Sequence, residues 1–107
     1  MTLTTINHTI SVLHNMMNDN WDLWETTTQA KRKVYDLQME YQHNDDFPIL
    51  ANAARMEATR LDLAIISIQA NREKLSKELK SVHQMQSAAL LAIVNENKDT
   101  REFLATL

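Results

Sequence analysis

The sequence has 107 residues and a formal net charge of −3, and it contains neither cysteine nor glycine. The missing cysteines exclude disulfides, thiolate metal sites and cysteine nucleophiles, and the missing glycines exclude the phosphate-binding loops that depend on them. The mild charge does not indicate nucleic acid or an acidic membrane surface as a partner, and a 44% apolar content predicts a folded chain.

Glycine and proline usage predicts an all-α chain with one reversal of direction. At average usage of about 7% a chain of this length carries roughly seven glycines. The single proline, Pro48, follows a polar run over residues 42–46. We therefore expect an antiparallel, coiled-coil-like helical hairpin in one domain over residues 1–107, with a longer second helix and assembly into a helical bundle.

A first helix is predicted over about residues 5–42, with Thr4 or Thr5 as its N-cap. Apolar residues recur there at spacings of three and four, which place them on one helix face. A second row beside the first widens this stripe beyond a two-stranded seam. The first row is Leu13, Met16, Asn20, Leu23, Thr27, Ala30, Val34, Leu37 and Tyr41, and the second is Ile10, Met17, Trp21 and Trp24.

A turn over residues 43–47 and a second helix over about residues 48–95 are predicted next. Asp46 is a suitable cap, and Pro48 fits the first helical turn, where its missing N–H costs nothing. The following seven-residue repeat is long and strict, which favours coiled-coil packing. Its members are Ala51, Ala54, Ala58, Leu61, Ile65, Ile68, Arg72, Leu75, Leu79, Val82, Gln86, Ala89 and Ile93.

The pattern weakens over residues 95–99. Asp99 and Glu102 have the spacing of a capping box, which predicts a short separate helix over residues 100–107. The alternative is that the second helix continues, since Phe103 and Leu107 extend the same heptad.

Antiparallel pairing about the turn sets which residues face each other. The basic residues 31–33 are expected near Glu57 and Asp62, and Asn20 is expected level with Arg72. Leu37 then lies against Ala54, Ala30 against Leu61, Leu23 against Ile68, and Leu13 against Leu79. The acidic residues Asp19, Asp22 and Glu25 are expected near Arg72, Lys74, Lys77 and Lys80.

The second helix is longer than the first, so its C-terminal part has no partner in the chain. This part holds the most apolar stretch of the sequence, over residues 88–94, and a helix that is apolar on nearly all sides is not stable alone in water. We expect it to bind a second copy or a partner helix; the alternative is that residues 100–107 fold back over it. The predicted partner-binding residues are Trp21, Trp24, Leu90, Leu91, Ile93 and Val94.

Few residues indicate a catalytic, cofactor-binding or metal-binding site. Glu40 and His43 have the spacing of one half of a di-iron motif and are weak metal candidates, because such a site needs a second motif and two more glutamates. His8, His14 and His83 lack metal-ligand spacing. No catalytic or cofactor-binding residue is identified, and we expect no enzyme, cofactor or small-molecule substrate.

Two further function classes are disfavoured by the sequence. The basic residues 31–33 could contact phosphates, but acidic residues follow them at once, so nucleic-acid binding is not expected. The apolar run from Ala88 to Val94 is far shorter than the ~20 residues that cross a bilayer. No ordinary signal peptide precedes the first helix, which predicts a cytoplasmic protein and leaves secretion without a signal peptide compatible.

These expectations favour a non-enzymatic interaction protein: an oligomerising adaptor, small chaperone or assembly component. The alternative is a subunit of a secretion apparatus, phage particle or filament. The layout of polar turn, proline and following helix resembles that of the small needle and rod subunits of type III secretion systems, and this resemblance covers the turn and second helix without any specific motif. A metal-binding bundle and a nucleic-acid-binding bundle are less favoured.

Overall fold

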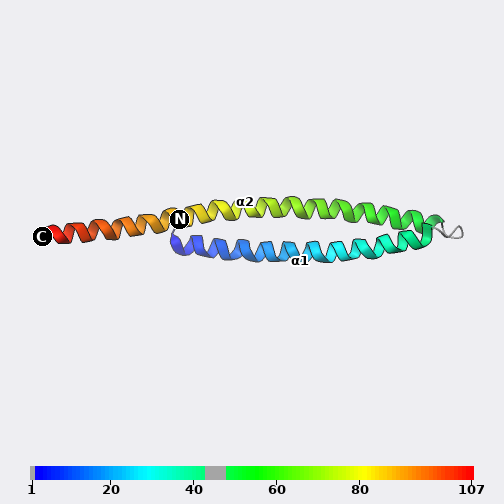
Figure 1. The fold of residues 1–107 in the computed structure, drawn as a ribbon, viewed down its shortest axis with the longest axis horizontal. Coiled ribbons are helices and arrows are strands. Elements are labelled where there is room, and N and C mark those ends of the chain that lie inside the picture. Colours follow the sequence, from blue (N-terminus) through cyan, green and yellow to red (C-terminus); the bar gives the residue numbers. More distant parts are fainter. Residues whose placement is uncertain (1, 43–47) are drawn as a thin grey trace. The chain divides into compact units, whose positions relative to one another are not determined.

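The computed structural model describes residues 2–42 and 48–107 and contains two α-helices and no strand in these ranges (Figure 1). Helix α1 spans Leu3–Gln42 and helix α2 spans Pro48–Thr106. The predicted all-α helical hairpin is confirmed. The predicted turn over residues 43–47, with its Asp46 cap, lies outside the described residues. No described residue has a positive φ angle. This agrees with the absence of glycine, the residue that adopts a positive φ most readily.

Helix α1 begins two residues earlier than expected, because Thr2 and not Thr4 or Thr5 caps it. The Thr5 N–H donates to Thr2 Oγ1 at 3.2 Å, and the Thr2 carbonyl accepts the Ile6 N–H at 3.0 Å. The first bond satisfies a backbone donor that the first turn cannot pair internally, and the second is the first i to i−4 bond of the helix. The threonines that follow Thr2 are therefore inside the helix.

Helix α2 is continuous to Thr106, so the predicted end near residue 95 and the separate helix over residues 100–107 are wrong. The capping-box spacing of Asp99 and Glu102 does not interrupt it. After Pro48 the chain contains no glycine or proline, which are the residues that most strongly end a helix. Asparagine and aspartate over residues 95–99 weaken the helix without breaking it.

The described residues group into two compact units, each built from both helices. The first unit comprises Met1–Met16 and Leu75–Leu107, and the second comprises Met17–Lys74. In each unit the helices are antiparallel, since higher residue numbers on α1 meet lower ones on α2. Whether residues 1–107 act as one domain stays a prediction.

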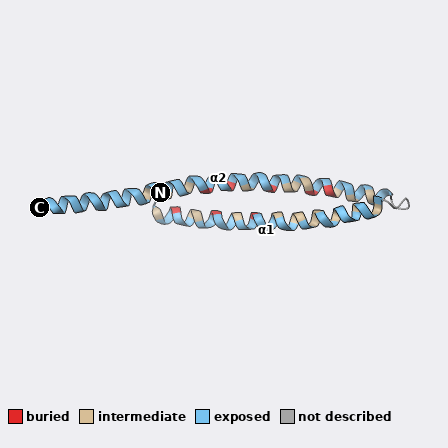
Figure 2. Ribbon diagram, in the orientation of Figure 1, coloured by how far each residue is buried: buried red, intermediate tan, exposed pale blue. Residues whose placement is uncertain are grey.

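In each unit the buried residues lie on the facing sides of α1 and α2 (Figure 2) and form a single row along each helix. The buried core residues of the first unit are Ile6, Leu13, Leu75 and Leu79, and those of the second are Ala58, Leu61 and Ile68. On α2, all seam residues predicted from Ala51 to Ala89 are buried or half-buried. Ile93, which continues the row, is 43% exposed.

The seam of α1 differs from the prediction at three positions. Met16, Leu23 and Leu37 are 46%, 54% and 44% exposed, whereas their neighbours one residue on, including Met17 and Trp24, are half-buried. The predicted row and the observed row that includes Met17 and Trp24 both have spacings of three and four residues, so spacing alone cannot choose between them. The row that faces α2 carries Trp24, whose aromatic surface is larger than that of Leu23.

Two leucines on α2 test this assignment of faces. Leu61 is 8% exposed, whereas Leu63, two residues on, is 63% exposed. We expect Leu61→Ala to lower the free energy of unfolding by about 2–3 kcal/mol, because it leaves a cavity in the seam. The matched Leu63→Ala change should cost under about 0.5 kcal/mol. Urea unfolding of the dilute protein, followed by circular dichroism, measures both; equal losses would contradict the assignment.

Candidate interaction surfaces

A hydrogen-bonded polar layer interrupts the apolar seam of the second unit. Asn20, 6% exposed, is the one buried polar side chain among the described residues. Its Nδ2 donates to the Ile68 carbonyl at 3.0 Å, and its Oδ1 accepts a hydrogen bond from Arg72 Nε at 2.8 Å. The prediction that Asn20 lies level with Arg72 across the two helices is confirmed. Because both the nitrogen and the oxygen of the Asn20 amide have a specific partner on α2, this layer favours one register of the two helices.

The two tryptophans of α1 surround the Arg72 guanidinium. Its Cζ lies 3.5 Å from the centroid of the Trp21 ring and 5.5 Å from that of Trp24, within range of cation–π attraction. The two rings meet edge to face with centroids 5.9 Å apart. This cluster, Asn20, Trp21, Trp24 and Arg72, is called the arginine–tryptophan cluster below.

Three donors at or beside this cluster have no hydrogen-bond partner in the described part of the chain: Trp24 Nε1, Thr28 Oγ1 and Arg72 Nη2. Trp21 keeps 48% of its surface exposed. The tryptophans predicted to bind a partner thus make extensive contacts within their own unit. Their role toward a partner stays a prediction.

Within the described ranges, one ion pair joins the helices of the second unit, between Lys31 and Asp62. This confirms the expected approach to Asp62 for Lys31, whereas Glu57, the other expected partner, pairs with Arg60 of its own helix. The Lys31 and Asp62 side chains are 38% and 49% exposed, so this pair contributes under about 1 kcal/mol. None of the acidic residues Asp19, Asp22 and Glu25 forms an ion pair with a lysine or arginine of those ranges, and the charge pairing expected there is absent.

Glu57 and Arg60 form a local pair on α2 that shifts the pKa values of both side chains. The side-chain hydrogen bond from Arg60 lowers the pKa of Glu57, and the same bond raises the pKa of Arg60. The two residues lie three positions apart on one helix. This is a surface contact within α2, typical of a solvated face.

The C-terminal part of α2 carries an uncovered apolar surface in the first unit. Gln86 Nε2 donates to Asn7 Oδ1 at 2.8 Å, near the start of α1, and Ala89 is half-buried. Every residue from 90 to 107 is exposed (Figure 2). The large apolar members, here called the C-terminal apolar surface, are Leu90, Leu91, Ile93, Val94, Phe103, Leu104 and Leu107, which are 43–89% exposed.

The expected alternative, in which residues 100–107 fold back over this stretch, is wrong, because these residues continue α2 to Thr106. In Figure 1 the C-terminal end of α2 extends past the start of α1. The four residues predicted here for partner binding therefore share one exposed helical segment with Phe103 and Leu104.

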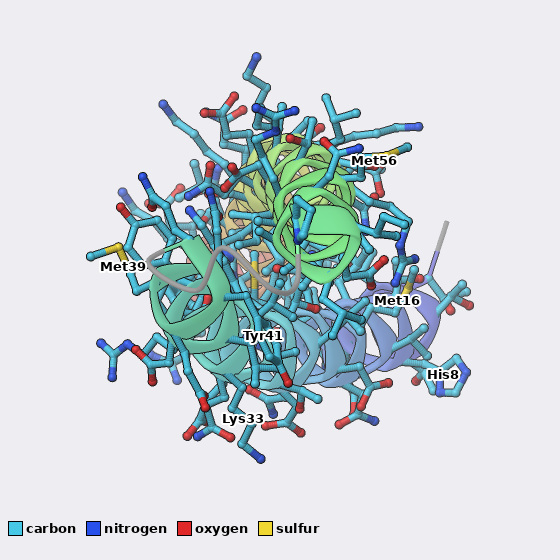
Figure 3. All side chains as sticks on the ribbon, turned by 90° about the vertical axis from the view of Figure 1, so that its right-hand side faces the viewer. His8, Met16, Lys33, Met39, Tyr41 and Met56 are labelled. Atoms are coloured by element: carbon cyan, nitrogen blue, oxygen red, sulfur yellow. The ribbon has the colours of Figure 1, made fainter. Side chains whose placement is uncertain are left out.

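A second exposed apolar row lies on α2 in the second unit and was missed by the sequence analysis. This outer row consists of Ile49, Met56, Leu63 and Ile66, which are 61–82% exposed. Figure 3 shows Met56 pointing outward from α2, whereas Tyr41 lies between the helices. Its first three members are seven residues apart, so a heptad count made on the face opposite the seam could have found it.

Two histidines of the first unit meet across the helices, although their sequence positions do not suggest it. The rings of His14 and His83 have centroids 6.0 Å apart in an edge-to-face arrangement. Glu40 is exposed on α1, and His43, its proposed metal-ligand partner, lies outside the described residues. Within residues 2–42 and 48–107 no three metal-ligating side chains gather at one place.

Comparisons with known protein families, with curated proteins and with solved structures found no match to this chain. Neither described helix contains a stretch long and apolar enough to cross a membrane.

A double-mutant cycle tests the polar layer. Asn20→Ala and Arg72→Ala each remove the hydrogen bond between the two side chains, so we expect a coupling energy of about 1–2 kcal/mol in chemical unfolding. Arg55 lies on the same helix and bonds Asn52 instead. Combining Arg55→Ala with Asn20→Ala is the control and should give additive losses. Coupling no larger than the control would show that the layer does not act as a unit.

Proposed function

We propose that this chain is a non-enzymatic interaction protein, a helical hairpin that assembles with copies of itself or with a partner helix through exposed apolar faces of α2. The observation that carries the proposal is the exposure of every residue from 90 to 107, in a segment that includes Leu90, Leu91, Ile93 and Val94. Apolar patches of this kind on helices mark contact surfaces. Such a protein acts as an adaptor, a small chaperone or a structural subunit.

Energetics support association through more than one patch. Burying a leucine, isoleucine or valine side chain contributes about 1.5–3 kcal/mol, and association costs about 4–15 kcal/mol. The residues of the C-terminal apolar surface together offset most of this range. The outer row adds further apolar area, as does Trp21, which is 48% exposed, whereas Trp24 is half-buried.

A double lysine substitution tests the proposal. Leu90→Lys with Ile93→Lys places two charges on the C-terminal apolar surface, so the mass measured by light scattering should fall to that of one chain, 12.4 kDa. The control is Ala88→Lys with Asn95→Lys, which adds the same charge on the other side of the helix and should keep the assembled mass. An unchanged mass and unchanged partner capture in the first variant would contradict the proposal.

The second candidate function is a subunit of a secretion apparatus, phage particle or filament. It is favoured by the presence of two separate apolar surfaces on α2, the C-terminal apolar surface and the outer row. Two different contact surfaces allow each copy to bind more than one neighbour, which is what open-ended assembly requires.

The outer row provides the test of this second candidate. We expect Leu63→Lys with Ile66→Lys to abolish any assembly larger than the one formed through the C-terminal apolar surface, as judged by electron microscopy and sedimentation of concentrated protein. The control, Gln69→Lys with Asn71→Lys, adds the same charge at exposed polar positions of α2 and should leave that assembly intact. Filaments that persist in the first variant would exclude the outer row as an assembly contact.

A further inference from the structure

We propose that residues 90–107 of α2 pair with the same residues of a second copy, in parallel and in register, as a short two-stranded coiled coil. This inference rests on the proposed function and names the partner and the geometry of that surface. It follows from a heptad row, a polar residue inside the row and the signs of the flanking charges.

The heptad row begins where α1 stops covering α2. Leu90, Ile93, Asn97, Thr100, Leu104 and Leu107 alternate by three and four residues, which is the spacing of coiled-coil a and d positions. All six are exposed. Leu90, Asn97 and Leu104 take the a positions, and Ile93, Thr100 and Leu107 take the d positions. The d positions Ile93, Thr100 and Leu107 also continue the seam through which α2 binds α1, whereas each a position lies one residue after the strict continuation of that seam.

Asn97 lies at the central a position of this row. An asparagine at a single a position is best satisfied by the same asparagine of a parallel, in-register partner, and it specifies the two-stranded state at a cost in stability. In an antiparallel pair Asn97 faces Thr100 instead. The position of this amide therefore favours a second copy of the same segment over an unrelated apolar helix.

The flanking charges give the same orientation. Glu96 takes the g position before Asn97, and Arg101 takes the following e position. In a parallel pair a g residue faces the e residue five positions later on the other chain, so Glu96 of each copy faces Arg101 of the other. In an antiparallel pair g faces g and e faces e, which brings Glu96 to Phe103 and Arg101 to Val94. Only the parallel arrangement pairs the two charges.

Cysteine cross-linking distinguishes the two arrangements, and the natural chain has no cysteine to interfere. In the parallel pair residue 104 lies beside residue 104, so Leu104→Cys should form a disulfide-linked dimer in a glutathione redox buffer. In the antiparallel pair residue 104 lies beside residue 93. A mixture of Leu104→Cys and Ile93→Cys chains should then give mainly the mixed dimer, and that result would overturn the proposal.

A charge series provides a second, independent measurement. Glu96→Lys places a positive charge against Arg101 in a parallel pair, so the dimer dissociation constant should rise about threefold to tenfold. Glu96→Lys combined with Arg101→Glu restores opposite charges and should return the affinity to that of the natural chain. An antiparallel pair predicts no change for Glu96→Lys alone, since residue 96 faces no charged side chain there, and that result would contradict the parallel arrangement.

The two proposals fail in different ways. If Leu90→Lys with Ile93→Lys lowers the mass but Leu104→Cys does not cross-link to itself, assembly through this surface stands and parallel pairing is wrong. If the natural chain has the mass of one copy at all concentrations and Leu104→Cys stays monomeric, self-pairing is wrong. Capture of a different protein by that monomer would then identify a partner helix as the occupant and equally overturn this proposal.

Discussion

A narrow row of side chains, one every three or four residues, holds α1 against α2 in each unit, and every other feature depends on which residues occupy it. The row contains seven buried apolar residues among those described and one buried polar side chain, Asn20. Because a single row buries little surface per residue, identity and register matter more here than in a thick core. The hydrogen bonds from Asn20 to the Ile68 carbonyl and from Arg72 to Asn20 favour one register where apolar contacts alone would tolerate several.

Because one face of each helix packs in this row, the apolar residues on the other faces remain exposed. On α1 exposed apolar side chains such as Leu23 and Leu37 border the seam, whereas α2 keeps two apolar surfaces that the seam does not cover, the C-terminal apolar surface and the outer row. The arginine–tryptophan cluster packs within the second unit and leaves Trp21 48% exposed. The two apolar surfaces on which the proposed contacts depend therefore both lie on α2.

The hairpin and the seam of α2 were predictable because glycine is absent, proline occurs once and the heptad from Ala51 to Ala89 is strict. The face of α1 that packs against α2 was not predictable, since Leu23 and Trp24 each continue a row with spacings of three and four residues. Only packing against Arg72 and its neighbours shows that Trp24 belongs to the seam. The meeting of His14 with His83 depends on the register of two helices, which no local pattern states. The continuity of α2 past residue 99 was underestimated because cap-like spacing was weighed without a glycine or proline to end the helix. The outer row was visible in the sequence, but only on a face that the seam does not use.

The uncovered end of α2 also has a consequence for the lifetime of the protein in a cell. From residue 90 onward every residue of α2 is exposed, so the helix is maintained mainly by its own backbone hydrogen bonds, and such segments open locally at little free-energy cost. An opened, apolar stretch of chain is what proteases and chaperones bind. In the proposed assembly this end is shielded by the partner, and a solitary copy displays it, so the same proposal implies that residues 90–107 mark unassembled chains for removal.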